Sequence, residues 1–324
     1  MGKSIFIALL LLVGATILFF KSTNYLSGDK KVVEAPVEKR SMWKAPDYEL
    51  IPDTKQGDLI RYGRELISFT SKYLGPHGTI AHISNGMNCQ NCHLEAGTRE
   101  WGNNYSAVFS SYPKFRARSG SVETINKRVN DCLQRSLNGE ALDSGSREMQ
   151  AIILYIQWLG KKIPHGIKPY GAGITDLPFM NRAADSSRGK LVFALKCSNC
   201  HGSNGQGILN SYGNMYLYPP LWGANSYNDG AGLYRLSRLA GYVKNNMPFN
   251  RAINEPKITD EEAWDVAAYI NSRPRPLKNY RSDWPDIKLK PFDHPYGPYA
   301  DAFTETQHKF GPFVNIVNKQ VPAH

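Results

Sequence analysis

Two short cysteine motifs constrain this chain more than any other feature of its sequence. Cys-x-x-Cys-His occurs as CQNCH at residues 89–93 and again as CSNCH at residues 197–201. Two thiols at this spacing form thioethers with the two vinyl groups of one porphyrin, and the histidine then lies beneath the iron. A zinc ribbon or a redox Cys-x-x-Cys pair does not require a histidine after each pair. We therefore expect two covalent haems c, attached through Cys89, Cys92, Cys197 and Cys200 and ligated by His93 and His201.

The N-terminal residues predict export. Residues Ser4–Phe20 are almost wholly apolar and lie between Lys3 and Lys21. A segment of this length is either a signal peptide or a short membrane anchor, and its weak cleavage pattern leaves both alternatives open. Either one places the rest of the chain in the periplasm, where haem c is attached.

The charge of the chain narrows the choice of partners. The formal net charge is +11 and the pI is near 9.3. Such a charge attracts nucleic acid, anionic membranes, or anionic ligands and proteins. The sequence has neither a long Lys/Arg block nor the aromatic platform typical of nucleic-acid-binding proteins. We therefore expect no nucleic-acid partner and interpret the charge as favouring protein docking and small anions.

The chain divides into two halves of similar organisation. Each half has a helical segment, one Cys-x-x-Cys-His motif, irregular loops and a closing aromatic helix, which is the order of a small cytochrome c. We expect a mostly α-helical protein with two tandem cytochrome c-like domains, each holding one covalent haem, and an irregular C-terminal strap. The expected divisions are 1–21 signal peptide or membrane anchor, 22–45 linker, 46–163 first domain with haem 1, 164–186 linker, 187–275 second domain with haem 2, and 276–324 C-terminal extension.

Helical periodicity locates the main helices. We expect opening helices at residues 55–73 and 187–194, and closing helices at residues 147–161 and 260–271. Thr259 is the predicted N-cap of the last helix, with Glu262 as its capping-box partner. The tail after Pro274 is rich in proline and aromatic residues and lacks periodicity, so we expect an extended strap in which His294 and His308 lie at the surface.

The fifth cysteine, Cys132, belongs to neither haem motif. An odd cysteine in an exported protein is a reactive thiol, a ligand, an intermolecular partner or a buried structural residue. We expect residues 121–137 to form a helix, which aligns Arg128, Cys132 and Ser136 on one face, with Arg118 just upstream. A sulfur beside two guanidinium groups and a hydroxyl suits a small sulfur oxyanion, and the arginines favour the thiolate. The alternatives for the arginines are pairing with haem propionates and ordinary surface charge.

The iron of haem 1 needs a sixth ligand or an open position. No Met-Pro follows the first motif at the usual distance, and His77 and His82 precede it in a glycine-rich loop. Met149 lies in a strongly apolar helix, where a core role is expected. Cys132 is therefore the best candidate for the distal side of haem 1.

For haem 2 the candidate ligand is a methionine. Met247, followed by Pro248, lies before the final helix, where a class I cytochrome c places its axial methionine. A His/Met haem has a raised potential and suits electron transfer. Met215 is the competing ligand, because it lies closer to the second motif.

Together these features resemble the dihaem thiosulfate dehydrogenases, a family that forms or reduces tetrathionate. The resemblance covers about residues 45–315 and rests on both haem motifs, the segment Tyr112–Ser136, Asn246-Met247-Pro248 and the segment Tyr296–Asp301. The cysteine segment is its specific part, because dihaem electron carriers do not need it. The resemblance implies a catalytic haem 1 and an electron-transfer haem 2, ligated by His93 with Cys132 and by His201 with Met247. It also implies that Arg118, Arg128 and Ser136 hold the sulfur oxyanion. Some members have a competing lysine just before the methionine, and this chain has Asn246 there.

The resemblance implies that two thiosulfate ions are coupled to tetrathionate, with electrons passing through both haems to a soluble cytochrome or similar acceptor. Tetrathionate reduction would use the same site, since the haem potentials set the direction. The two arginines would offset the repulsion between two dianions, and Cys132 is either a ligand only or a nucleophile that bonds transiently to substrate sulfur. The alternatives are a Sox-type enzyme that conjugates thiosulfate to a carrier protein, a dihaem electron carrier without its own substrate, and a dihaem peroxidase.

Overall fold

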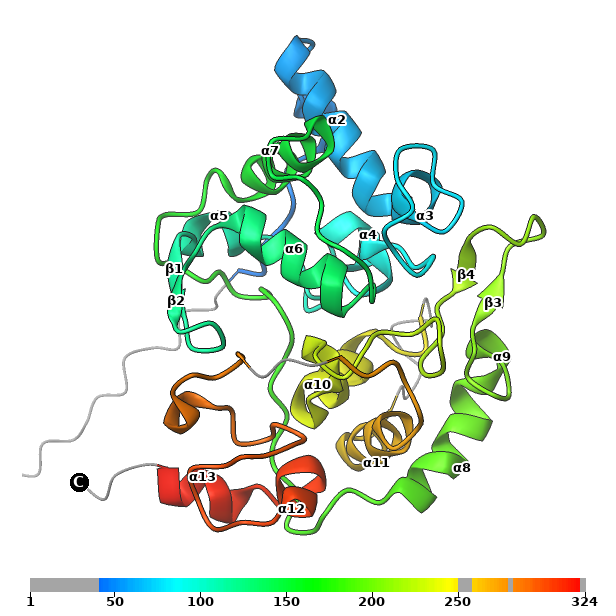
Figure 1. The fold of residues 1–324 in the computed structure, drawn as a ribbon, viewed down its shortest axis with the longest axis vertical. Coiled ribbons are helices and arrows are strands. Elements are labelled where there is room, and N and C mark those ends of the chain that lie inside the picture. Colours follow the sequence, from blue (N-terminus) through cyan, green and yellow to red (C-terminus); the bar gives the residue numbers. More distant parts are fainter. Residues whose placement is uncertain (1–40, 250–257, 279–281, 321–324) are drawn as a thin grey trace, which may run out of the picture. The chain divides into compact units, whose positions relative to one another are not determined.

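The computed structural model describes residues 41–249, 258–278 and 282–320. The predicted signal peptide or anchor at 1–21 and residues 22–40 of the predicted linker lie outside this part of the chain. Within the described ranges, no helix is both long enough and apolar enough to cross a membrane. Figure 1 shows a largely helical chain with two short β-hairpins.

The first domain is built on two packed helices, α2 (Lys55–Ser68) and α7 (Arg147–Gly160), which lie side by side in Figure 1. Thr54 and Ser146 cap them, because each hydroxyl accepts a hydrogen bond from a backbone N–H of the first turn. Met149 is fully buried in the core between them, in the structural role that its apolar helix predicts. Burial of a side chain of this size stabilises the fold by about 1.5–3 kcal/mol.

Short elements surround this helix pair and carry the first haem motif. The predicted helix at residues 55–73 is interrupted at Phe69, whose φ of −128° and ψ of 45° are not helical. The break has a local cause, because the Thr70 hydroxyl donates to Leu66 O at 2.8 Å and accepts from the Cys89 amide at 2.9 Å. The short elements are η1 (Tyr48–Leu50), α3 (Thr70–Leu74), η2 (Cys89–Asn91), α4 (Leu94–Gly97) and α5 (Val108–Ser111).

The second domain has the same plan, with α8 (Ser186–Lys196) packed on α11 (Asp260–Asn271) and α10 (Leu236–Asn246) packed beside α11. The observed α11 has the predicted bounds, and its capping box is present. Thr259 Oγ1 accepts from the Glu262 amide at 3.1 Å, and the Glu262 carboxylate accepts from the Thr259 amide at 2.9 Å. The remaining elements are α9 (Ser198–His201), η3 (Gly232–Tyr234) and an antiparallel hairpin of β3 (Ile208–Leu209) and β4 (Tyr216–Tyr218).

A glycine allows the close helix crossing in each domain. A Cβ on Gly63 of α2 would lie 2.0 Å from Ala151 O of α7. A Cβ on Gly189 of α8 would lie 1.9 Å from Asp265 O of α11. Both distances are far below van der Waals contact, so only glycine permits this approach. The two halves therefore share the same close crossing of an opening and a closing helix.

The segment that contains Cys132 begins as a strand. β1 (Lys114–Arg116) pairs antiparallel with β2 (Ser121–Glu123), and α6 then spans Ile125–Arg135. The prediction of a helix over residues 121–137 is therefore wrong at its start. Thr124 is the N-cap of α6 and separates strand from helix. Helical propensity alone does not reveal this boundary, because β2 depends on pairing with β1.

The C-terminal extension contains helices and buried histidines. Its elements are η4 (Ile287–Leu289), α12 (Glu305–Phe310) and α13 (Val314–Gln320). His294 and His308 are only 4% and 1% exposed, so the surface prediction for both is wrong. Tertiary hydrogen bonds explain this difference, since a buried imidazole needs partners for both ring nitrogens.

His308 shows how these bonds fix the extension. Its Nδ1 lies 2.6 Å from Phe292 O, and its Nε2 lies 2.9 Å from the Asp301 carboxylate. The ring also stacks on Tyr299, with 3.7 Å between the ring centroids. His308 therefore ties α12 to the preceding loop of the extension.

The second domain contacts the first haem motif directly. The Tyr242 hydroxyl on α10 donates to Asn91 O at 2.9 Å, and Asn246 Nδ2 donates to Trp101 O at 3.0 Å. Tyr227, in the loop before η3, is buried within the core of the first domain. The two haem domains therefore share packing as well as hydrogen bonds.

Candidate functional site

The first haem motif folds into one tight turn beside the first residues of α3. The His93 amide donates to Cys89 O at 2.9 Å, and Asn91 Oδ1 accepts from the Asn88 amide at 2.7 Å. Asn88 Oδ1 in turn accepts from the Ser71 amide at 2.8 Å, which fastens the turn to α3. All five cysteines of the chain are free of disulfides, so each motif keeps both thiols for thioether formation.

His93 is oriented as an iron ligand. Its Nδ1 lies 2.5 Å from Asn103 O, so Nδ1 carries the proton and donates it, and Nε2 keeps its lone pair for a metal. The ring stacks on Tyr105 at a centroid distance of 4.5 Å. Burial lowers the pKa of His93 to about 4 against the effect of the Asn103 hydrogen bond, and the Arg128 charge lowers it further. The imidazole is therefore neutral at pH 7, as a ligand must be.

The second motif repeats this arrangement. His201 Nδ1 lies 2.8 Å from Pro219 O, and the imidazole is buried. Burial lowers the pKa of His201 below its usual value. Each motif therefore offers two thiols and a neutral imidazole whose Nδ1 is tied to a carbonyl, and this donor set fits haem c.

The structure favours Met247 over Met215 as the second ligand of haem 2. Met247 follows α10 and packs against the core of the second domain, as Cys197 of the haem motif also does. Met215 instead lines a separate cavity with Lys72 and His77 of the first domain. The assignment of Met247 stays a prediction.

Helix α6 places Cys132 and Arg128 one turn apart, close to the first haem motif. The pKa of Arg128 is raised, mainly by the charge of Cys132 and against the effect of burial. Burial is the main cause that raises the pKa of Cys89 to about 11 and of Cys92 to about 12, and Cys132 raises both further. These mutual effects require proximity, so Cys132 and Arg128 lie close to the thiols of the first motif.

Arg128 differs from the other arginines of this region because its guanidinium forms no hydrogen bond or ion pair with any residue that the structure describes. Ser136 is similar, since only its backbone N–H is used, donating to Cys132 O at 2.8 Å. Both side chains therefore have donors available for a ligand.

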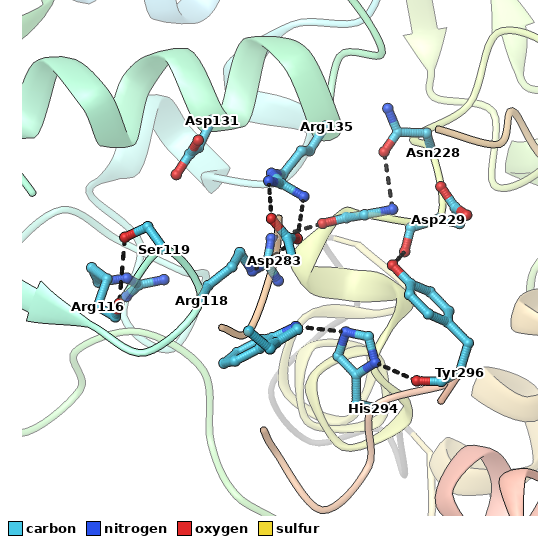
Figure 2. Close-up of polar contacts among 12 residues, drawn as sticks. Arg116, Arg118, Ser119, Asp131, Arg135, Asn228, Asp229, Asp283, His294 and Tyr296 are labelled. Carbon is cyan, nitrogen blue, oxygen red and sulfur yellow. Dashed lines mark hydrogen bonds and ion pairs between the residues drawn. The ribbon is translucent and has the colours of Figure 1, made fainter. Parts of the chain in front are cut away.

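Arg118 is held by distant parts of the chain, as Figure 2 shows. Its Nη1 donates to Gly230 O at 2.9 Å, and its Nε lies 3.9 Å from the Asp283 carboxylate. The guanidinium also lies over the ring of Trp284, 5.5 Å from its centroid. Asp283 also accepts two hydrogen bonds from Arg135, both of 2.8 Å. The C-terminal extension thus fixes two arginines of the first domain.

Positive charge is in excess at this site. Burial lowers the pKa of Arg118 to about 10, and Arg135, Arg128 and Arg116 lower it as well, while Asp283 opposes them. The described carboxylates that pair with this group are Asp283 and Glu123, the latter 3.9 Å from Arg116. Arg116, Arg118, Arg128 and Arg135 therefore lie close enough to act on one another, and such a cluster of guanidinium groups attracts a small anion.

The predicted site residues thus fall into two groups. The structure brings Cys132, Arg128 and His93 together, with the thiols of Cys89 and Cys92. Arg118 lies beside Arg128 on the side of the C-terminal extension. Ser136 follows Cys132 by one helical turn, at the C-cap of α6.

Sequence reasoning missed the residues that position Arg118 and Arg135. Asp283 and Trp284 lie in the tail and Gly230 lies in a loop of the second domain. Asp283 is 148 residues from Arg135 in the sequence, and no local pattern reports such a pairing. The only available signal was an acidic residue in an otherwise Pro- and aromatic-rich segment, which is too common to interpret.

Comparison with known families matches both domains. Residues 80–164 match the family described as SoxA/TsdA, cytochrome c domain, and residues 186–274 match the cytochrome c family. With the two complete donor sets, these matches show that the protein carries two covalently bound haems c, one in each domain.

Whole-chain comparison identifies closer relatives. The chain is 38% identical over 244 residues to a thiosulfate dehydrogenase of Psychrobacter arcticus, covering 75% of this chain and 72% of that protein. It is 36% identical over 236 residues to a thiosulfate dehydrogenase of Allochromatium vinosum, covering 72% and 84%. The solved thiosulfate dehydrogenase (TsdBA) from Marichromatium purpuratum superposes with a TM-score of 0.67 at 32% identity. That superposition covers 73% of this chain and 50% of the solved chain, so this chain spans about half of that protein. Taken with the two haem motifs and the cysteine helix, these similarities show that the chain belongs to the thiosulfate dehydrogenase family.

Proposed function

We propose that this protein is a thiosulfate dehydrogenase that couples two thiosulfate ions to tetrathionate, releasing two electrons (2 S₂O₃²⁻ → S₄O₆²⁻ + 2 e⁻). The observation that carries the proposal is the group of side chains close to the first haem motif. A cysteine outside both haem motifs lies there beside Arg128, which has no partner among the described residues. The family relationship supplies the substrate.

The arginines reduce the electrostatic repulsion between the two substrate ions, which is the main physical difficulty of this reaction. Two dianions must approach each other, and their repulsion is strong wherever water is excluded. Arg128 and Ser136 have free donors, and Arg118 adds a fixed positive charge behind them. Fixed charges of this kind stabilise the approach of two anions without reorganising during the reaction.

Cys132 is the proposed distal ligand of haem 1, and its sulfur also gives the site a nucleophile. When bound, the two haems supply one-electron acceptors for the two electrons released. In a covalent route, the Cys132 thiolate and thiosulfate would form a sulfur–sulfur bond with loss of two electrons. A second thiosulfate would then displace the thiolate and release tetrathionate. In the alternative route Cys132 is a ligand only. Mass spectrometry of the protein after thiosulfate treatment distinguishes the covalent route from this ligand-only route.

We also propose the direction and location of electron flow. Cys197, Cys200, His201 and Met247 would hold haem 2, and the haem would supply the exit for electrons to a soluble cytochrome or similar acceptor. The basic net charge of +11 suits an acidic partner. We propose a periplasmic location, which the protein would reach through its N-terminal segment, acting either as a cleaved signal peptide or as an uncleaved anchor. Tetrathionate reduction is the same chemistry reversed.

The test is haem reduction by thiosulfate in stopped-flow absorbance, with Cys132→Gly beside the wild type. The matched control is Gln134→Gly, which introduces the same flexible residue two positions along α6. We expect rapid reduction in the wild type and in the control. We expect its loss in Cys132→Gly, with both haems still attached.

The other outcomes distinguish the alternatives. A wild type that is neither reduced by thiosulfate nor, once reduced, oxidised by tetrathionate would be a dihaem electron carrier. Transfer of thiosulfate to a carrier-protein cysteine without tetrathionate formation would indicate a Sox-type enzyme. Equal reduction rates in wild type and Cys132→Gly would remove Cys132 from the mechanism.

A further inference from the structure

Arg275, the last residue of the predicted second domain, is a buried cation with unused donors. The side chain is 9% exposed. Its Nη2 donates to Ile270 O at 2.8 Å and lies 3.5 Å from Asn271 Oδ1. Its Nε and Nη1 are both shielded from solvent, and neither has a hydrogen-bond partner.

Two tyrosine rings cover the faces of this guanidinium. Its central carbon lies 4.3 Å from the centroid of Tyr227 and 4.8 Å from that of Tyr234. Cation–π contact of this kind is favourable, but it supplies neither an acceptor for an N–H nor a formal negative charge. The two edge donors therefore stay unsatisfied.

No protein carboxylate neutralises Arg275 among the described residues. Asp229 is close enough for the Arg275 charge to affect it, yet burial is the main influence on Asp229 and raises its pKa. The Asp229 carboxylate accepts from the Lys278 amide at 2.9 Å and forms no ion pair with Arg275. A guanidinium does not lose its proton in proteins, so burying it without an anion is strongly unfavourable.

The surroundings of Arg275 belong to both haem-binding cores. Tyr227 and Tyr234 pack in the core of the first domain, against which Cys89 of the first motif also packs. Ile270 and Asn271 are the last residues of α11, and Ile270 packs in the second core, as does Cys197 of the second motif. The guanidinium thus lies at the junction of the two cores, beside residues that pack with both haem motifs.

We infer that Arg275 binds a haem propionate. A propionate is an anionic acceptor that accompanies each covalent haem into the protein, and charge-assisted N–H···O bonds to a carboxylate would satisfy Nε and Nη1. This role is separate from the thiosulfate site, since Arg275 is not among the arginines around Cys132. It makes Arg275 a determinant of haem potential, because a fixed positive charge beside the propionate favours the reduced haem.

The test compares Arg275→Gln with Arg273→Gln in the protein loaded with both haems. Arg273 is an exposed neighbour that also stacks on aromatic rings, so the control removes the same charge from the same segment. We expect a shift of the propionate bending band in resonance Raman spectra and a lower midpoint potential for one haem in Arg275→Gln. We expect neither change in Arg273→Gln.

The spectra also identify which haem supplies the carboxylate. With the proposed ligation, by Cys132 thiolate in haem 1 and by Met247 in haem 2, the two haems are distinguishable by magnetic circular dichroism during the redox titration. A change confined to either haem supports the inference and assigns the propionate. Unchanged propionate bands and potentials in Arg275→Gln, with both haems bound, would overturn it, as would equal changes in the control. If Arg275→Gln does not fold, Arg275→Lys keeps the charge with a different donor geometry, and the same band must shift.

Discussion

Arg128 differs from the neighbouring arginines because its guanidinium has no partner among the described residues. Arg118 and Arg135 both contact Asp283 of the C-terminal extension. Arg128 has no such partner among the described residues, although it lies in the same positive region and beside Cys132. Its donors are therefore the ones most directly available to a substrate oxyanion.

Replacement of Arg128 tests this role. Arg128→Gln should lower kcat/KM for thiosulfate by about 10²- to 10³-fold, because one charged donor to the reacting anions is lost. Lys127→Gln is the matched control, since it removes a positive charge from the neighbouring, exposed position of α6. Steady-state kinetics with an artificial acceptor, normalised to haem content, measures both. A decrease of similar size in Lys127→Gln would indicate a general charge effect.

The packing of α2 on α7 and of α8 on α11 is the repeated unit of this protein. In both pairs a glycine brings its helix against a backbone carbonyl of the partner. Helix pairs at this separation hold the opening and closing segments of each haem domain together. The loops between them, which carry the haem motifs, are thereby fixed at both ends.

Gly63→Ala tests the importance of this contact. The added methyl group would lie 2.0 Å from Ala151 O, so α2 and α7 must separate. We expect a destabilisation of about 1–3 kcal/mol, measured by guanidinium unfolding of the haem-loaded protein. Gly232→Ala is the control, because Gly232 is exposed and no atom lies within 4 Å of its added Cβ. Unchanged stability of Gly63→Ala would mean that the helices adjust freely.

The sequence predicted those elements whose signals are local. The bounds of α11 follow from a capping box and an apolar stripe, and both haem motifs are contiguous in the chain. The first turn of the Cys132 helix was mispredicted, because strand β2 exists only through its pairing with β1. His294 and His308 were placed at the surface, because their burial depends on partners elsewhere in the extension, such as Trp284 and Asp301. The candidate ligands and arginines were predictable from spacing, whereas their supporting contacts were not.

At the scale of the whole molecule, the proposed oxyanion site of the first domain depends on the rest of the chain. Gly230 of the second domain accepts from Arg118, and the Asn228 amide donates to Arg135 O at 3.1 Å. Asp283 of the extension contacts both arginines. The second domain and the C-terminal extension therefore help to fix the positions of Arg118 and Arg135 of the first domain.

Asp283→Asn should expose this dependence. Loss of the carboxylate leaves the clustered arginines to repel one another, so Arg118 and Arg135 should shift. We expect kcat/KM for thiosulfate to fall on the order of 10- to 100-fold, mostly through a higher KM, with unchanged haem content. Asp286→Asn is the control, because Asp286 is an exposed residue of the same segment that caps η4. Equal kinetics in Asp283→Asn and wild type would show that the arginines hold their positions without the extension.

The place of Asp283 in the chain has a consequence for biogenesis. Both haem attachment motifs end by residue 201, whereas Asp283 and Trp284 follow much later. During synthesis and export the N-terminal parts emerge first, so both motifs reach the haem-attachment machinery before the segment that fixes Arg118 and Arg135. A chain that stops short of Asp283 would therefore mature as a red, dihaem protein without an organised oxyanion site, which makes colour alone a poor measure of correctly finished enzyme.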